Sequence, residues 1–292
     1  MSSTNPFQLD RQAVRRSFGR AAAGYDAVAV LQREVQARLL ERLELINFTP
    51  ATILDAGAGT GTGVRVLTER YPEAAVTALD VAEGMLAAIP SDRPRVCGDM
   101  EALPLQDGRF DLVWSNLAVQ WLVDPDRGFG ELRRVLNERG LLLFSTFGPD
   151  TLRELRAAWS AVDQFNHVNH FIDMHDLGDA LVRAGFAEPV MDVEQLTLTY
   201  EDIGGLLRDL KGLGAHNVTA GRPRGLTGRA RLNGLKEAYE RWREDGRLPA
   251  TWEVVYGIAW APMAFEQVAL AHQGEIPPDQ LRELLRRKRH GA

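Results

Sequence analysis

The chain has 292 residues, of which 45% are hydrophobic and 25% charged, a composition typical of a globular protein with a substantial core. Lysine and arginine number 34 against 40 aspartates and glutamates, a net charge of −6, which argues against a general nucleic-acid binder because phosphate neutralisation needs a basic surplus. The single cysteine, Cys97, excludes an internal disulfide and a cysteine-based zinc site. No apolar signal core opens the sequence and no run approaches ~18 apolar residues, so we expect a soluble, cytoplasmic protein that does not enter a membrane.

The first sixty residues predict two helices and then a strand that ends in glycines. Apolar residues recur at helical spacing over 9–45, with interruptions at Gly19 and Gly24, which places the junction of the two helices near Gly24. Residues 51–55 form a short β-rich run that leads directly into four spaced glycines and a new helical pattern. This order of strand, glycine loop and helix is typical of a ligand-binding α/β fold.

Strand and helix patterns alternate through the next ninety residues. Strand runs at 76–80, 95–99, 110–115 and 141–146 are separated by helical stretches at 84–89, 118–122 and 126–137. Repeated β-α units of this length predict a parallel, doubly wound α/β sheet.

The pattern changes after residue 147. Helical patterns follow at 150–162, 174–184, 202–212 and 228–245, and strand patterns at 189–199 and 250–260. The two late strands lack the spacing of β-α repeats, so we expect them to pair with each other at one edge of the sheet. The simplest division is one domain, 1–260, with N-terminal lid helices at about 9–45, helical insertions at about 148–188 and 202–246, and a C-terminal helical extension, 261–292, of open role.

The glycine loop indicates a nucleotide-like ligand that carries positive charge. Glycines after a strand let the backbone approach a ligand, and the next helix offers free N–H groups. The spacing Gly57-x-Gly59-x-Gly61 differs from the dinucleotide pattern G-x-G-x-x-G, and Asp55 before the loop would repel a pyrophosphate. S-adenosylmethionine, with its sulfonium and amino groups, suits that carboxylate better than NAD does.

Acidic residues also follow the next two strand runs. Asp80 ends the second run and is placed to accept hydrogen bonds from ribose hydroxyls. Asp99 ends the third run, where a carboxylate could accept a hydrogen bond from the adenine amino group. Ligands of open α/β sheets lie at such strand ends. The ordered set of three aspartates therefore favours S-adenosylmethionine as the cofactor, with hydride transfer to NAD as the main enzymatic rival.

These residues resemble the class I methyltransferases, through Leu54-Asp-Ala-Gly-Ala-Gly-Thr-Gly61, Leu79-Asp80, Gly98-Asp-Met-Glu101 and Phe110-Asp-Leu-Val-Trp-Ser-Asn116. More particular motifs are Phe18-Gly-Arg-Ala-Ala-Ala-Gly-Tyr-Asp26, Ser115-Asn-Leu-Ala-Val-Gln-Trp121, His167-Val-Asn-His-Phe171 and Leu210-Lys-Gly-Leu-Gly-Ala-His-Asn217. Over about residues 10 to 260 they look like the malonyl-carrier-protein O-methyltransferase family of biotin synthesis. The resemblance implies a seven-stranded Rossmann-like sheet, five strands parallel plus a late edge pair, with helical lid insertions.

The same resemblance implies an activity and a set of site residues. The activity is methylation of the free carboxylate of a malonyl thioester on acyl-carrier protein. The cofactor set comprises Asp55, Gly57, Gly59, Gly61, Asp80, Val81, Met85, Asp99, Met100 and Asn116. The substrate set comprises Tyr25, Trp121, Phe171, Lys211, His216, Asn217 and Arg222.

The predicted mechanism needs neither a general base nor a metal ion. A carboxylate with a pKa near ~4 is already ionised at pH 7, so positioning and water exclusion are the expected catalytic effects. Tyr25 is the expected positioning residue at the reacting centre. The histidines and aspartates between His167 and Asp176 match no metal-ligand spacing. The alternatives left open are a class I methyltransferase acting on another small acid or a quinone-type ring, and a binding protein that has lost the chemistry.

Basic residues gather in two places despite the negative net charge. Arg222, Arg224, Arg229 and Arg231 follow the Lys211–Asn217 motif, and a second group lies at 286–289. A carrier protein is an acidic partner, and its phosphopantetheine arm must enter near the substrate motif. We therefore expect the first group to dock malonyl-acyl-carrier protein.

Overall fold

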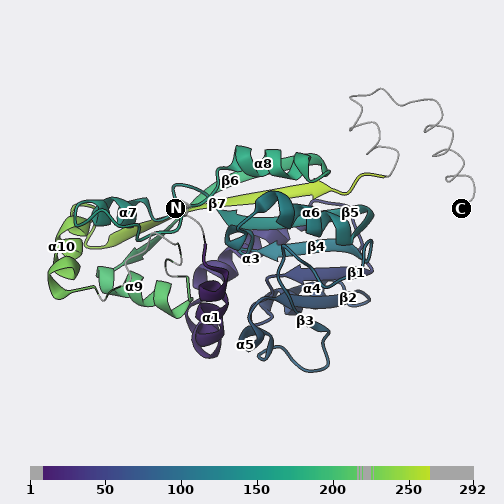
Figure 1. Cartoon of the computed structure of the whole chain (residues 1–292), viewed down its shortest axis with the longest axis horizontal. Coiled ribbons are helices and arrows are strands. Elements are labelled where there is room, and N and C mark those ends of the chain that lie inside the picture. Colours follow the sequence, from purple (N-terminus) through teal and green to yellow (C-terminus); the bar gives the residue numbers. More distant parts are fainter. Residues whose placement is uncertain (1–8, 216, 218, 220–224, 226, 264–292) are drawn as a thin grey trace, which may run out of the picture.

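The computed structural model describes residues 9–215, 217, 219, 225 and 227–263. Their centre is a seven-stranded sheet with strand order β3-β2-β1-β4-β5-β7-β6 (Figure 1). The first five strands of this order are parallel, and β7 and β6 are antiparallel to their neighbours. The predicted doubly wound sheet with a late edge pair is thereby confirmed.

The strand bounds follow the sequence patterns closely. They are β1 Thr52–Ala56, β2 Ala75–Asp80, β3 Arg95–Cys97, β4 Phe110–Asn116, β5 Leu136–Phe147, β6 Ala187–Tyr200 and β7 Leu248–Trp260. The clearest difference is β5, which begins five residues before the predicted start because α6 (Pro125–Val135) runs directly into it without a loop. Its early residue Leu136 pairs with Phe110, and a bulge then resets the register to Leu112 and Leu141.

Helices cover both faces of the sheet. Successive residues of β1, β4 and β5 point to opposite faces, so Ile53, Leu112 and Leu143 join one core and Leu54, Val113 and Leu142 the other. The first core is completed by α3 (Val30–Glu44) and α4 (Thr62–Arg70), and the second by α6 and α8 (Met174–Arg183). This arrangement leaves the carboxyl ends of the parallel strands free to build a site.

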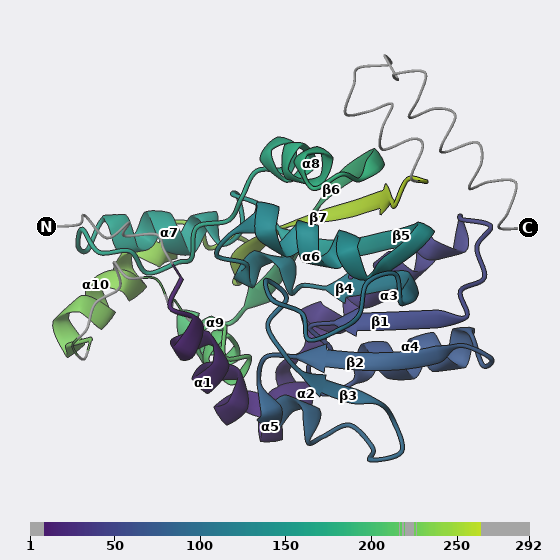
Figure 2. The same ribbon diagram turned by 45° about the vertical axis from the view of Figure 1, so that its right-hand side comes forward.

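The N-terminal segment forms more than the two predicted helices. Helix α1 (Arg11–Ala21) is capped by the Asp10 side chain, and a 3-10 turn (Ala22–Gly24) and the four-residue α2 (Tyr25–Val28) separate it from α3. The predicted break near Gly24 is present, and a second break falls at Ala29, whose backbone leaves the helical region. The segment therefore folds back near the strand ends, and α1 contacts α5 (Glu83–Leu86) there (Figure 2).

Three late helices form a cap at one end of the molecule, which also contains the ends of β6 and β7 (Figure 1). They are α7 (Arg153–Ser160), α9 (Ile203–Gly212) and α10 (Arg229–Glu240). Helix α7 packs on β7 and α10, whereas α9 packs on β6 and α2. The cap therefore touches the N-terminal lid as well as the sheet.

Two smaller findings complete the fold. The stretch 118–122, expected as a helix, is a single 3-10 turn, Val119–Trp121. No helix among the described residues is both long and apolar enough to cross a membrane. The expected C-terminal extension lies outside the described residues apart from 261–263, so the proposed division of the chain stays a prediction.

Candidate active site

The glycine loop after β1 has a backbone conformation that residues with side chains rarely adopt. Gly57, Gly59 and Gly61 all have positive φ angles, of 86°, 55° and 91°, which favour glycine. A Cβ atom on Gly57 would lie 2.2 Å from the Cβ of Ala118, whereas one on Gly59 would have no neighbour within 4 Å. The loop is therefore packed tightly against the turn after β4 at Gly57 and left open to a ligand at Gly59.

Asp80 at the end of β2 holds this loop in place. Its carboxylate accepts hydrogen bonds from the backbone N–H of Gly59 at 2.9 Å and of Ala82 at 2.8 Å. Burial raises the pKa of Asp80, and these N–H groups oppose that shift. Asp80 and Gly59 line a cavity of about 100 Å³, here called the front cavity, with Val81, Met85, Met100 and Asn116. Oxygen lone pairs remain available on Asp80 for the hydroxyls of a ribose.

A second, smaller space lies behind the loop. This rear cavity is lined by Gln32 and Arg33 of α3, Asp55, Trp114 and loop residues 57–60. Three buried side-chain atoms at residues of this wall have no hydrogen-bond partner in the described part of the chain: Oε1 of Gln32, Oδ2 of Asp55 and Nε1 of Trp114. Two acceptors and one donor suit the ammonium and carboxylate of an amino-acid end. The residues present therefore fit S-adenosylmethionine, with its adenosyl part in the front cavity.

Asp55 is the most perturbed carboxyl of the site. It is 2% exposed, and burial together with the nearby Asp80 charge raises its pKa to about 7, although a hydrogen bond from the backbone of Val64 opposes the shift. A buried carboxylate is stabilised by a cation. The sulfonium and amino groups of the cofactor would supply that cation.

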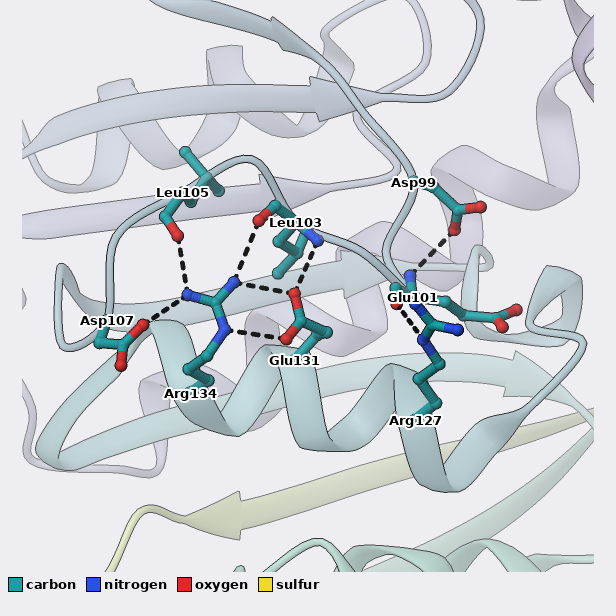
Figure 3. Close-up of polar contacts among 8 residues, drawn as sticks. All are labelled: Asp99, Glu101, Leu103, Leu105, Asp107, Arg127, Glu131 and Arg134. Atoms are coloured by element: carbon teal, nitrogen blue, oxygen red, sulfur yellow. Dashed lines mark hydrogen bonds and ion pairs between the residues drawn. The ribbon is translucent and has the colours of Figure 1, made fainter.

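Asp99 and Glu101 form the far wall of the front cavity, beyond β3. Arg11 of α1 donates to Glu101 and lies 3.3 Å from Asp99. Figure 3 shows the rear support of this segment: Arg127 of α6 donates to the Glu101 carbonyl at 2.7 Å, and the Glu101 N–H donates to Asp99 at 2.9 Å. In the same view Arg134 binds the carbonyls of Leu103 and Leu105. Helix α6 therefore supports the segment that follows β3, and α1 contacts the same segment through Arg11.

Helix α1 also contacts the cap. Ser17 donates to the carbonyl of Gly214 at 2.9 Å, just after α9. Phe18 meets Trp121 edge to face, with ring centroids 5.2 Å apart. Tyr25, next to α1, lines both the front and the rear cavity. Burial raises the pKa of Tyr25 well above its ordinary value, and the charges of Asp80 and Asp26 raise it further, so its hydroxyl stays protonated.

The cap encloses a third cavity of about 180 Å³, here called the cap cavity. Its wall is mainly aromatic and aliphatic, and it includes Phe147, Trp159 and Trp252. His167 stacks on Trp159 with ring centroids 3.6 Å apart and pairs with Asp163 at 2.8 Å. Trp121 lines both this cavity and the front cavity. One side chain therefore lies between the two spaces.

The structure gathers most of the predicted site residues around these three cavities. Nine of the predicted cofactor residues line the front or rear cavity: Asp55, Gly57, Gly59, Asp80, Val81, Met85, Asp99, Met100 and Asn116. Gly61 lines neither and instead directly precedes α4 as its N-cap residue, where a Cβ would meet Ile89 at 2.8 Å. Of the predicted substrate residues, Trp121, Phe171, Lys211 and Asn217 line the cap cavity, and Tyr25 lines the front and rear cavities.

Some of the remaining predicted residues lie outside the described part of the chain, and others have contacts that the sequence did not predict. His216, Arg222 and Arg224 are not among the described residues. Arg229 is exposed at the start of α10, and Arg231 lies 3.7 Å from Asp163. Among the described ranges, no group of three or more histidines, cysteines and acidic residues could hold a metal ion.

Sequence reasoning missed several wall residues. Arg11 and Gln32 lie on helices whose polar positions look like solvent-facing ones, and no local pattern marks them. Trp114 sits beside Asp55 in the register of β1 and β4, so its neighbourhood could have been anticipated from the predicted sheet. Trp252 comes from the last strand, more than a hundred residues after the glycine loop, and only the tertiary structure brings it to the cap cavity.

The fold, with the front and rear cavities at the ends of its parallel strands, is that of the class I S-adenosylmethionine-dependent methyltransferases. Residues 54–144 match the family model described as a methyltransferase domain. A provisionally named methyltransferase of Bacillus halodurans has the same fold, with a TM-score of 0.55 at 19% identity over 78% of this chain and 100% of that one. Phosphoethanolamine N-methyltransferase 2 of Haemonchus contortus, solved in complex with S-adenosyl-L-methionine, gives a TM-score of 0.52 at 15% identity over 84% of this chain and 57% of that one.

A closer relative narrows the class. The malonyl-[acyl-carrier protein] O-methyltransferase of Gallionella capsiferriformans is 58% identical over 270 residues, covering 88% of this chain and 93% of the relative. The chain belongs to the malonyl-[acyl-carrier protein] O-methyltransferase family.

Proposed function

We propose that this protein transfers a methyl group from S-adenosylmethionine to the free carboxylate of malonyl-acyl-carrier protein, as a step of biotin synthesis. The observation that carries the assignment from the structure is the position of Trp121, which lines both the front cavity and the cap cavity. A shared wall residue means that the two cavities adjoin, so that a carboxylate oxygen from the cap cavity could reach the methyl group of a cofactor in the front cavity by direct contact. The identity of the methyl acceptor is inferred from the relatives, which are named malonyl-[acyl-carrier protein] O-methyltransferases.

The chemistry requires alignment more than proton transfer. When bound, S-adenosylmethionine supplies an electrophilic methyl group on its sulfonium and is left as a neutral thioether. The attacking malonyl carboxylate is ionised at neutral pH. The protein's own contribution is to hold the two reactants in line, and a closed, apolar cavity strengthens that effect by excluding water.

Tyr25 is the residue we assign to the reacting centre. Its raised pKa keeps the hydroxyl a donor at every physiological pH. Because it lines both cofactor cavities, it lies near the junction between the adenosyl and amino-acid ends of the cofactor. A single hydrogen bond from a phenol can orient a carboxylate oxygen and leave its charge in place. Phe171 would exclude water from the cap side, since its ring packs on Phe147 at 5.6 Å.

The remaining assignments concern the carrier protein. We assign its docking to the basic group Arg222, Arg224, Arg229 and Arg231, with His216, Lys211 and Asn217 at the entrance for the phosphopantetheine arm. The support is that Lys211 and Asn217 line the cap cavity and that Arg229 is exposed at the start of α10. We place the protein in the cytoplasm, where a chain with one cysteine needs no oxidising environment.

Docking can be separated from malonyl recognition by substrate choice. Arg222 and Arg224 changed together to Glu should lower kcat/KM for malonyl-acyl-carrier protein more than for malonyl-coenzyme A. This difference between the two substrates should shrink as the salt concentration rises. The Debye length, ~8 Å at physiological ionic strength, becomes shorter at higher salt, and the attraction between the arginines and the acidic carrier protein is then screened. An equal loss on both substrates would instead assign these arginines to the malonyl or phosphate group.

The methyl transfer itself is tested by mass spectrometry. Malonyl-acyl-carrier protein incubated with the enzyme and S-adenosylmethionine should gain one methyl group, and the gain should be reversed by ester hydrolysis. Free malonate and simple phenols serve as competing acceptors. Methylation of a phenol, with none of the malonyl thioester, would reject the assignment.

A further inference from the structure

Buried polar atoms without a partner are few in the described part of the chain, and one of them belongs to the cap cavity. The indole Nε1 of Trp252 is buried and has no hydrogen-bond partner among the described residues. Of the unpartnered atoms in the described residues, it alone comes from a side chain that lines this cavity. A buried tryptophan N–H normally finds an acceptor, and no protein group in the described part of the chain supplies one here.

The surroundings of Trp252 hold the indole ring firmly. The residue is 4% exposed and lies on β7, between β5 and β6 in the sheet. Its ring packs on Phe147 with centroids 5.1 Å apart. The preceding residue, Thr251, is tied to Glu154 of α7 through its N–H at 3.1 Å. A donor fixed on a strand that is paired within the sheet is preorganised for a ligand.

The chemistry of the cavity decides which acceptor suits this donor. A carboxylate in an apolar space needs a cation or several donors, whereas a neutral carbonyl oxygen needs one. A malonyl thioester offers both groups, and its carboxylate must face the cofactor to accept the methyl. The thioester carbonyl is then the acceptor left for the cap side.

Resting on the proposed function, we propose that the Trp252 indole N–H donates a hydrogen bond to the thioester carbonyl of the malonyl group and so makes the enzyme specific for a thioester. Free malonate places a second carboxylate where that carbonyl lies, and one neutral N–H donor offsets the desolvation of a charge less well than that of a neutral carbonyl. The same contact fixes one end of the short acyl unit, which helps to aim the other end at the methyl group.

The test removes the donor and the acceptor separately. The acceptor is removed with a carboxyethyl thioether of the carrier protein, in which CH2 replaces the thioester C=O while the carboxylate and the chain length are kept. The donor is removed by Trp252→Phe. On the malonyl thioester the variant should lose about 5- to 30-fold in kcat/KM, chiefly through KM, because a binding contact is lost. On the thioether the variant and the wild type should be equal.

A matched control lies on the same strand. Trp260→Phe makes the same chemical change at a residue that packs on Phe48, with centroids 5.6 Å apart, and does not line the cap cavity. It should leave both substrates unaffected. The affinity of Trp252→Phe for S-adenosylmethionine, measured by calorimetry, should also equal that of the wild type, because Trp252 lines neither cofactor cavity.

A second variant covers the case in which the smaller ring disturbs folding. Benzothienylalanine at position 252 keeps the two-ring shape and replaces the N–H with sulfur, and it should reproduce the loss on the thioester alone. An equal loss on thioester and thioether, for either variant, would show that Trp252 acts by packing and would overturn the inference. Failure of the wild type to methylate the malonyl thioester would instead reject the proposed function, so the two failures are distinct.

Discussion

The cofactor side and the cap side of the site are built in different ways. On the cofactor side, short strands end in carboxylates, and backbone N–H groups fix Asp80 from two positions. On the cap side, aromatic rings from β5, α7 and β7 enclose a mainly apolar space. We expect the first side to recognise charge and hydroxyl groups of a ligand, and the second to exclude water and contribute single polar contacts. Mutations should therefore separate into effects on cofactor affinity and effects on turnover.

The largest effect on the cofactor side is expected for Asp80→Ala. Loss of charge-assisted hydrogen bonds to the ribose, together with the anchor of the Gly59 N–H, should weaken cofactor binding by more than about tenfold. Calorimetry measures the affinity, and Asp92→Ala, at an exposed position outside both cofactor cavities, is the control. A folded Asp80→Ala protein with unchanged affinity would remove Asp80 from the site.

Asp55→Asn should weaken cofactor binding by about tenfold and yet stabilise the cofactor-free protein at pH 8. The sign follows from the pKa of about 7, which lies above the ordinary value. The folded protein keeps this proton longer than the unfolded chain, so the contribution of Asp55 is favourable below pH ~4 and is lost as pH rises through about 7.

The gain at pH 8 should be on the order of 2 kcal/mol in the free energy of unfolding. Urea titrations at pH 5 and pH 8 measure it, and the difference between the two pH values should be smaller in the variant than in the wild type. Equal pH dependence in both proteins would contradict the assignment of a raised pKa to Asp55.

Tyr25→Phe tests the boundary between the two sides. Cofactor affinity should remain within about twofold, whereas turnover should fall about tenfold, because one hydrogen bond at the reacting centre is lost. Single-turnover kinetics with saturating cofactor report the chemical step. If affinity falls and turnover does not, Tyr25 belongs to the cofactor side alone.

The smallest effect is expected for Arg11→Ala. The guanidinium is 47% exposed but pairs with Glu101, which is 2% exposed, so its removal should weaken cofactor binding by about threefold. Arg16→Ala is the matched control, since Arg16 is exposed on the same helix and contacts Gln12. Equal affinities of the two variants would show that Arg11 does not hold the helix over the cavity.

The contrast between the two sides also explains what the sequence could predict. Asp55, Asp80 and Asp99 each follow a strand pattern, and the rule that ligands lie at strand ends assembles them without a structure. The fold class and the late edge pair followed from periodicity and spacing in the same way. The early start of β5 did not, because the chain passes from α6 to the strand with no turn residue to mark the boundary.

The cap could be predicted only through family resemblance. Lys211 and Asn217 belong to a motif, but Trp252 and Trp159 are aromatic residues in ordinary core patterns, and nothing local separates a cavity wall from a packed interior. Which of them meet depends on how α7 and β7 pack. The ion pair from Arg11 to Glu101 spans ninety positions and has no signal in either segment.

Helix α1 is fastened at several points along its length, to Glu101 through Arg11, to Trp121 through Phe18 and to Gly214 through Ser17. Eleven residues make a rod about 16 Å long, and a stiff rod passes a displacement of one end on to the other. A movement of α1 away from the front cavity would therefore also break its contact with the turn that follows α9. Opening of the cofactor site would in that case loosen the cap as well, and the exchange of the two ligands would be coupled.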